Sequence, residues 1–289
     1  MESLDFLYGT ALGRALLRPL VSRPVSKLAG AFLDTALSRP LIPFFVKSCG
    51  IDTEDYDLRQ IRCFNDFFCR PLKEGRRPID QDPSSLIAPC DGLLTAVPIR
   101  EDTVLPVKQS RYSLSRLLGD AELAGGFRNG LCLVFRLCVD HYHRYCYFES
   151  GRTGENVFLP GVLHTVRPVA LEKTPVFTEN CREYTCIETE RFGTAVQMEV
   201  GAMLVGRIVN EAPWPREVKR GEEKGHFAYG GSTIILLLQK DAAELLPEIR
   251  EASARGEEFP VRMGQKIGFT IKYNTKPPSR RLFEKDDPK

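Results

Sequence analysis

The chain has 289 residues and a mass of 32.6 kDa, and 43% of its residues are hydrophobic and 27% charged, which is enough to bury the core of one large domain or two small ones. Forty Lys and Arg against 38 Asp and Glu give a net charge of +2, so we expect no global field that recruits nucleic acid. No apolar run approaches the roughly 20 residues of a membrane-spanning helix.

The N-terminus and the cysteines bear on the compartment. Glu2 and Asp5 stand where a secretory signal would carry basic residues, so no such signal is evident. Nine cysteines, an odd number without a Cys-x-x-Cys pair, suit a reducing compartment better than a disulfide framework. We therefore expect a cytoplasmic protein.

Residues 1–82 are predicted to be mainly helical. Residues 4–49 alternate apolar clusters with single bases and prolines, a pattern typical of short broken amphipathic helices. Such helices could cover the core or lie on a membrane surface, and the pattern does not decide between the two. A second predicted helix, 58–69, is rich in phenylalanine and ends at Arg70-Pro71.

Residues 83–276 are predicted to form a β-rich domain, because short β-branched or apolar runs alternate with glycine and proline. The sequence predicts a short helix from the N-cap Ser113 to Gly119, and a surface helix over 241–254 interrupted by Pro247. Residues 277–289 are expected to be a flexible tail. The predicted strands are 92–97, 131–139, 144–148, 162–169, 184–188, 195–208 and 233–239.

The most informative stretch joins a glycine pair to a hydroxyl pair, Gly230-Gly231-Ser232-Thr233, before an apolar strand. Two glycines allow strained backbone conformations, and such strain favours attack of the Ser232 side chain on the carbonyl of Gly231. A simple glycine turn before a buried strand explains the same residues. The local pattern leaves both interpretations open.

Further segments with characteristic residues occur along the chain in a fixed order: Arg70-Pro71-Leu72-Lys73, Ala88-Pro89-Cys90-Asp91-Gly92, Tyr112 to Gly119, Asp140-His141-Tyr142-His143-Arg144, Leu159 to Leu163, Val200 to Ile208 and Val261 to Gly268. Together with Gly231-Ser232-Thr233, these segments resemble the phosphatidylserine decarboxylase family. The likeness runs from about Phe64 to Gly268, and the ordered set is far more specific than any one motif.

The resemblance implies a proenzyme that cuts itself between Gly231 and Ser232. Ser232 Oγ would convert the Gly231 amide to an ester, and elimination followed by loss of ammonia would leave a covalent pyruvoyl cofactor at position 232. Two chains would result, of about 26 and about 6.5 kDa in proportion to their lengths. A Schiff base between the pyruvoyl group and phosphatidylserine would then release carbon dioxide and phosphatidylethanolamine.

The resemblance also implies the fold and the partners. We expect an α+β protein in which N-terminal helices cover a β-rich catalytic domain. The two fragments would stay associated as a heterodimer, with further oligomerisation left open. Because the acyl chains of the substrate cannot leave the bilayer cheaply, the enzyme would be peripheral, at the cytoplasmic face of the cell membrane.

The family's self-cleavage is assigned to an Asp, His, Ser constellation with the logic of a hydrolase triad, which implies Asp91, His143 and Ser232 here. The family motif often carries a second histidine where this chain has Cys146, which we interpret as a space-filling residue. From the local sequence alone, the commoner interpretation of Asp91 is a turn aspartate before Gly92. Possible supporting residues are His141, Tyr142, Arg144 and Cys146, and Tyr142 and Arg144 could either hold the headgroup or close the strand.

Two other functions compete with the decarboxylase. His141 and His143 would project from one face of a strand, so with His164 they could ligate a metal in a hydrolase, although this leaves Gly231-Ser232 unexplained. A catalytically altered lipid-headgroup-binding protein on the same fold is the other alternative. The decarboxylase interpretation includes no metal ion.

Overall fold

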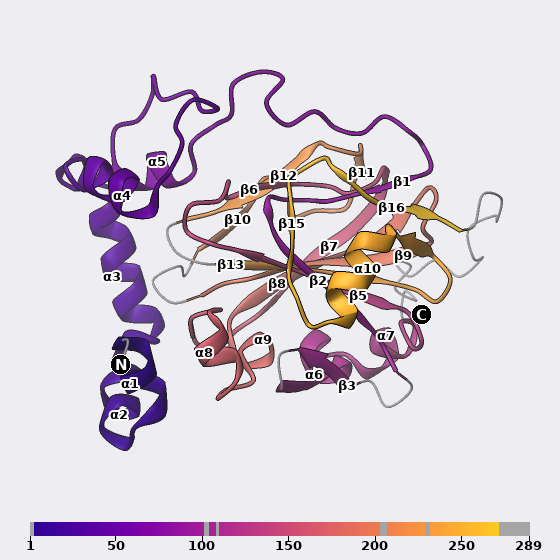
Figure 1. Cartoon of the computed structure of the whole chain (residues 1–289), viewed down its shortest axis with the longest axis horizontal. Coiled ribbons are helices and arrows are strands. Elements are labelled where there is room, and N and C mark those ends of the chain that lie inside the picture. Colours follow the sequence, from indigo (N-terminus) through magenta and orange to yellow (C-terminus); the bar gives the residue numbers. More distant parts are fainter. Residues whose placement is uncertain (1–2, 101–103, 108–109, 203–206, 229–231, 272–289) are drawn as a thin grey trace, which may run out of the picture.

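The computed structural model describes residues 3–100, 104–107, 110–202, 207–228 and 232–271 (Figure 1). Gly231 and the predicted tail 277–289 lie outside these ranges. Helices and β-sheets together build the described part of the chain, which agrees with the predicted α+β class. None of the helices within these ranges has the length and apolar character needed to cross a bilayer.

The largest sheet of the described residues has eight antiparallel strands in the order β11-β7-β8-β9-β13-β5-β2-β15. Within it, β7, β8 and β9 are neighbours both in the chain and in the sheet, whereas β13 lies between β9 and β5 and is therefore reached by a crossover. The strands are β2 (Gly92–Pro98), β5 (Leu131–Leu137), β7 (Gly151–Leu159), β8 (Arg182–Thr189), β9 (Thr194–Val200), β11 (Glu217–Val218), β13 (Ser232–Leu238) and β15 (Phe259–Val261).

Smaller sheets complete the β structure. One has the order β1-β16-β14 and another the order β10-β12-β6, and β3 pairs with β4. The first two lie above the large sheet in Figure 1, and short helices lie below it. Their strands are β1 (Ser85–Ile87), β3 (Val104–Val107), β4 (Ser110–Ser113), β6 (Arg144–Cys146), β10 (Ile208–Asn210), β12 (Glu223–Phe227), β14 (Ala243–Leu245) and β16 (Lys266–Thr270).

The strand β13 lies at the centre of the large sheet, between β9 and β5, and each of its residues is buried. Its alternate side chains enter two different cores: Ile235 packs toward the helices and Ile234 toward the smaller sheets. Each fully buried Ile or Leu contributes about 1.5–3 kcal/mol. The predicted central strand over 233–239 is confirmed over 233–238, and it begins at Ser232 itself.

The short helices of the β-rich part are α6 (Leu114–Leu118), α7 (Ala121–Gly125), α8 (Pro168–Leu171), α9 (Val176–Glu179) and α10 (Pro247–Ala254). The predicted helix 113–119 is confirmed, with Ser113 at the N-cap and Gly119 in the left-handed region at φ 67°. The predicted interruption at Pro247 is wrong. Proline occupies the first turn of α10, where its missing N–H costs nothing, and the preceding residues form β14.

Two strand predictions need correction. Residues 162–169 form no strand, because the Asn180 side chain binds both the N–H of His164 (2.9 Å) and its carbonyl (2.8 Å) in place of a ladder partner. Residues 195–208 are not one strand, since β9 ends at Val200 and β10 begins at Ile208. The long strand β7 was not predicted, because its glycines and polar residues hide the alternation.

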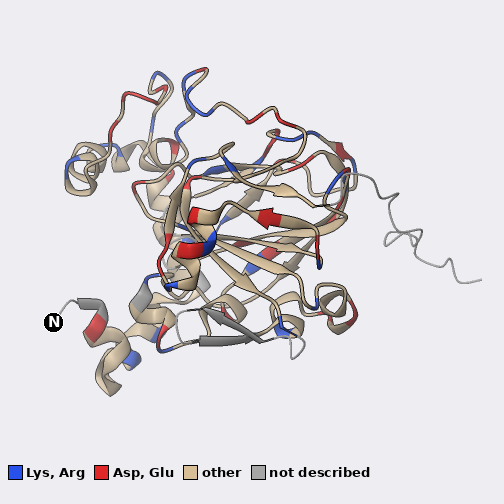
Figure 2. Ribbon diagram, turned by 45° about the vertical axis from the view of Figure 1, so that its right-hand side comes forward, with Lys and Arg blue, Asp and Glu red and all other residues tan. Residues whose placement is uncertain are grey.

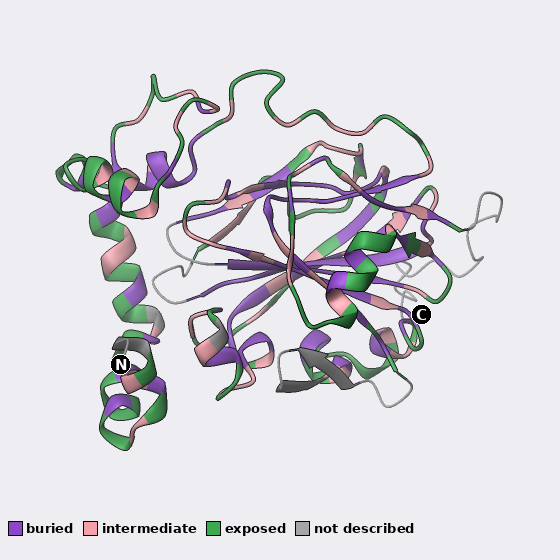
Figure 3. Ribbon diagram, in the orientation of Figure 1, coloured by how far each residue is buried: buried purple, intermediate pink, exposed green. Residues whose placement is uncertain are grey.

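The N-terminal helices stand beside the large sheet (Figure 1) and are α1 (Ser3–Gly9), α2 (Ala11–Leu20), α3 (Arg23–Leu33), the 3₁₀ helix η1 (Ala36–Ser38), α4 (Leu41–Cys49) and α5 (Phe64–Phe68). The predicted helix 58–69 is thus confirmed only over 64–68. Figure 3 shows much of these helices as exposed, while the strands of the large sheet are mostly buried. Figure 2 shows acidic and basic residues mixed over the fold, in keeping with the small net charge.

Candidate active site

The predicted site residues lie toward one end of the large sheet. Asp91 immediately precedes β2, whose Leu93 pairs with Arg136 near the end of β5. The last residue of β5, Leu137, pairs in turn with Ser232, the first residue of β13. In neighbouring antiparallel strands, one strand begins where the other ends. Asp91, the turn after β5 and Ser232 therefore lie at the same end of the sheet, although 141 positions separate Asp91 from Ser232.

Ser232 is fully buried, and its Oγ finds no hydrogen-bond partner among the described residues. A buried hydroxyl without a partner costs roughly 1–3 kcal/mol, so folded chains rarely keep one without a reason. The adjacent Thr233 Oγ1 is likewise without a described partner. A buried hydroxyl without a described partner therefore lies at the first position of the central strand.

His143 is also fully buried, and its two ring nitrogens differ. Nδ1 lies 2.9 Å from the carbonyl oxygen of His141, whereas Nε2 has no partner among the described residues. The ring packs on Phe68 with centroids 4.0 Å apart. Burial, and next the nearby charge of Arg70, lower the pKa of His143 well below its ordinary value of 6.5. The imidazole is therefore neutral near pH 7, the form that a general base requires.

Arg70 is a fully buried arginine that binds backbone oxygens. Its Nη2 donates to the carbonyls of Asp140 (3.1 Å) and His141 (3.5 Å), and its Nη1 donates to that of Phe67 (3.3 Å). The guanidinium stacks over the ring of Tyr56, 4.1 Å from the centroid. Arg70 thus fixes the turn that carries both histidines.

Asp91 is buried beside Arg77, not against a histidine. Its carboxylate accepts from Arg77 Nη2 (2.7 Å) and Nε (2.9 Å), and from the backbone N–H of Met263 (2.8 Å). Arg77 also donates to Asp55 at 3.0 Å. Burial lowers the pKa of Arg77, but the hydrogen bonds to Asp91 and Asp55 and the charge of Asp91 together raise it above the ordinary value. Asp91 is therefore held by two nitrogens of Arg77, and no hydrogen bond joins it to His143 in the described structure.

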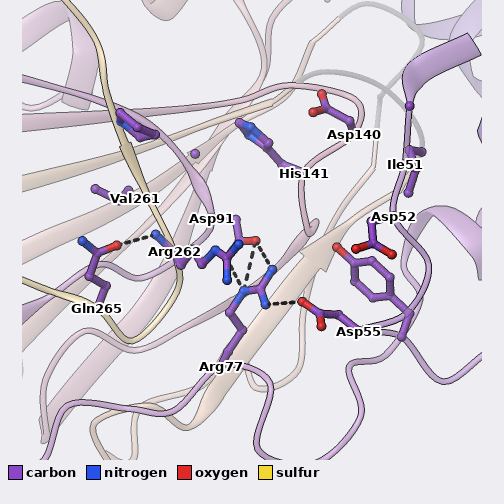
Figure 4. A pocket seen from close by; sticks show the side chains of 14 residues that line it. Ile51, Asp52, Asp55, Arg77, Asp91, Asp140, His141, Val261, Arg262 and Gln265 are labelled. Atoms are coloured by element: carbon purple, nitrogen blue, oxygen red, sulfur yellow. Dashed lines mark hydrogen bonds and ion pairs between the residues drawn. The ribbon is translucent and has the colours of Figure 1, made fainter.

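A pocket of about 490 Å³ opens beside this ion pair (Figure 4). His141 lies above the Arg77–Asp91 pair in the close-up, and Arg262 beside it. Burial lowers the pKa of His141, while the charges of Asp140 and Asp91 oppose that shift. The lining combines acids and bases with few apolar groups: Gly50, Ile51, Asp52, Asp55, Tyr56, Arg77, Asp91, Gly92, Asp140, His141, Pro260, Val261, Arg262 and Gln265.

The remaining supporting residues have structural partners. Arg144 donates to the carbonyl of Cys69 (2.8 Å) and to Glu223 (2.5 Å), so it closes strand β6. Tyr142 is buried, and burial raises its pKa. Cys146 is buried as well, and burial raises the pKa of its thiol to about 12, which keeps the thiol protonated and unreactive at neutral pH.

The histidines do not gather as the metal hydrolase would need. His164 binds the hydroxyl of Tyr8 at 3.2 Å, on the helix-covered side of the sheet. Among the described side chains, the groups of three with ligand atoms close enough for one ion are Cys138, Asp140 and His141, and Glu211, Glu223 and His226. Neither group contains His143 or His164.

Arg70 and Arg77 were not predicted as site residues. Arg70 belongs to one of the segments that carry the family resemblance. Its position directly after the aromatic residues of a predicted helix that ends at Pro71 is the only other feature of the sequence that marks it. Arg77 precedes Pro78 in a charged segment that resembles any surface loop. Their contacts join residues 14 and about 70 positions apart, which spacing in a single sequence does not reveal.

Known proteins are similar to this chain over almost its whole length. The family model described as phosphatidylserine decarboxylase matches residues 64–269. The chain is 40% identical to phosphatidylserine decarboxylase proenzyme 2 of Clostridium acetobutylicum over 268 residues, covering 92% of this chain and 91% of the relative. It is 38% identical to the proenzyme of Ruminiclostridium cellulolyticum over 278 residues (94% and 93%), and 36% identical to that of Clostridium perfringens over 273 residues (93% and 93%).

A buried serine at the first position of a central strand, with a turn that carries a buried histidine at the same end of the sheet, is compatible with a serine-dependent enzyme, although no hydrogen bond joins Ser232 to His143 among the described residues. The match over most of the chain makes the assignment specific. The chain belongs to the phosphatidylserine decarboxylase family.

Proposed function

We propose that this protein decarboxylates phosphatidylserine to phosphatidylethanolamine and carbon dioxide, after cutting itself between Gly231 and Ser232. The observation that carries the proposal is the buried Oγ of Ser232, which has no described partner. It lies at the end of the central strand that pairs with the last residue of β5. A pyruvoyl group formed from Ser232 fits this position, and its carbonyl supplies the electron sink that loss of carbon dioxide needs.

The residues around Ser232 have separate roles in this proposal. His143 takes the hydroxyl proton through Nε2, since its Nδ1 already donates to the carbonyl of His141. Arg70 holds the turn, and its charge adds to the effect of burial in lowering the pKa of the imidazole. Asp91 acts with Arg77 as a fixed charge pair at the pocket, a positioning role that needs no contact with His143.

The two fragments stay associated in this proposal because the cut would fall directly before β13. That strand pairs with β5 over seven residues and with β9 over six. Separating the fragments would expose its apolar side chains, each worth about 1.5–3 kcal/mol when buried. The heterodimer should therefore dissociate only on denaturation.

We propose that the N-terminal helices dock the enzyme on a membrane surface, at the cytoplasmic face. Residues 10–50 carry six bases and a single acid, Asp34. Large apolar side chains on α2 to α4 face solvent, with exposed fractions of 65% for Leu12, 76% for Leu28 and 75% for Phe44. Apolar anchors beside bases fit a surface of anionic lipid.

The test is incubation of the purified protein with vesicles that contain phosphatidylserine, followed by lipid analysis. Formation of phosphatidylethanolamine by the wild type and not by Ser232→Ala supports the proposal. Binding of the same vesicles without any product would favour the lipid-headgroup-binding alternative. Trapped carbon dioxide, released in equal amount to the phosphatidylethanolamine, confirms the reaction type.

A further inference from the structure

The turn after β5 carries two histidines whose ring nitrogens have different partners. The backbone N–H of Cys138 donates to Nδ1 of His141 at 3.1 Å. A backbone N–H can only donate, so this Nδ1 must be the unprotonated nitrogen, and the ring proton lies on Nε2. His143 is the reverse case, because its Nδ1 faces the carbonyl of His141 at 2.9 Å and a carbonyl can only accept.

We propose that the two imidazoles are held in opposite neutral tautomers and divide the chemistry between them. His143 presents a bare Nε2 and serves as the acceptor, and His141 presents an Nε2–H and serves as a hydrogen-bond donor to an anionic oxygen of the substrate headgroup. The backbone sets this division, since one residue, His141, both receives the N–H of Cys138 on its ring and offers its carbonyl to His143.

The surroundings of the two rings fit these roles. His143 is fully buried, as a base that acts only on the buried Ser232 would be. His141 is partly exposed and lines the pocket next to Asp91 and Arg262 (Figure 4). Its Nε2 makes no hydrogen bond to a described residue, so this proton is available to a molecule in the pocket.

His141 also stays neutral for a geometric reason. Protonation of Nδ1 would set two donors, the ring N–H and the Cys138 N–H, against each other at 3.1 Å. A neutral imidazole can still stabilise developing negative charge through its N–H, and it does so without a change of protonation. The headgroup of phosphatidylserine offers carboxylate and phosphate oxygens as acceptors, so this inference rests on the proposed function.

The tautomers can be measured without any activity. The full-length Ser232→Ala proenzyme, labelled with ¹⁵N-histidine, contains four histidines, and single His→Gln variants assign their resonances. We expect the proton on Nε2 for His141 and on Nδ1 for His143. The same tautomer in both rings, or an imidazolium at His141 at pH 7, would overturn the inference. This result does not depend on whether the wild type acts on phosphatidylserine, so failure of the proposed function is recognised separately.

The donor role is tested with a matched pair of variants. His141→Asn keeps an acceptor near the Nδ1 position for Cys138, but it removes the pocket donor, whereas His141→Gln places an amide N–H near the Nε2 position. We expect both to cut themselves into two chains, kcat/KM for phosphatidylserine to fall at least tenfold in the Asn variant, and the Gln variant to recover part of it.

Glycerophosphoserine, added to the labelled Ser232→Ala protein, provides the binding test, and it should shift the Nε2 resonance of His141 more than that of His143. Absence of that shift, wild-type kinetics in His141→Asn, or an uncut His141→Asn protein each contradicts the donor role. The last outcome would place His141 in self-cleavage instead.

Discussion

Replacing Arg77 by methionine should destabilise the fold severely through Asp91. Both side chains are nearly buried, with 7% of Arg77 and 9% of Asp91 exposed, and two guanidinium nitrogens contact the carboxylate. Removing one partner of a buried ion pair typically costs about 3–5 kcal/mol, because the remaining charge is left without compensation. Asp91 keeps the N–H of Met263, so we expect a loss of about 3 kcal/mol, the low end of that range.

Urea unfolding is the assay, carried out in the Ser232→Ala background so that one intact chain unfolds. Arg77→Met combined with Asp91→Asn removes both charges and should recover most of the lost stability. Arg59 provides the matched control, because its ion pair with Asp57 is exposed and Arg59→Met should leave the midpoint unchanged. A loss below 1 kcal/mol in Arg77→Met, or additive losses in the double variant, would refute the ion-pair argument.

Four further predictions concern the site and the surface. His143→Ala should stop or greatly slow self-cleavage while Cys146→Ala cleaves normally, as gel analysis would show, and the opposite pattern would reverse the two roles. Because the pKa of His143 lies below 6.5, its base form persists as pH falls, so the cleavage rate should stay flat from pH 8 to 6.5. Arg70→Met raises that pKa and should move the acid decline to higher pH, and an unmoved profile would contradict its role. Leu28→Glu with Phe44→Glu should weaken flotation with anionic vesicles at least tenfold, and unchanged flotation would exclude α3 and α4 as the dock.

The central strand could be predicted from the sequence, because five consecutive apolar residues, 234–238, fit few alternatives, whereas Ser232 was singled out only by the family resemblance. The helix 113–119 was equally accessible, since Ser113 and Gly119 mark its two ends with local chemistry. Capping residues of this kind act on backbone groups only a few positions away, so they can be recognised directly in the sequence.

The long-range contacts that shape the site could not be predicted from such local patterns. The sequence places Asp91 with a histidine only through the family resemblance, whereas the folded chain binds it to Arg77. The segment 162–169 has strand-like residues, yet the side chain of Asn180 captures its backbone groups. In each case a partner from elsewhere in the fold decides the outcome, and pattern within one segment cannot name that partner.

The intact mass of the purified protein under denaturing conditions tests the central claim most directly. The account predicts two chains, of about 26 and about 6.5 kDa, with the smaller one starting in a ketone in place of an amine, and a single unmodified chain for Ser232→Ala. A single wild-type chain of 32.6 kDa that nevertheless decarboxylates phosphatidylserine would contradict it.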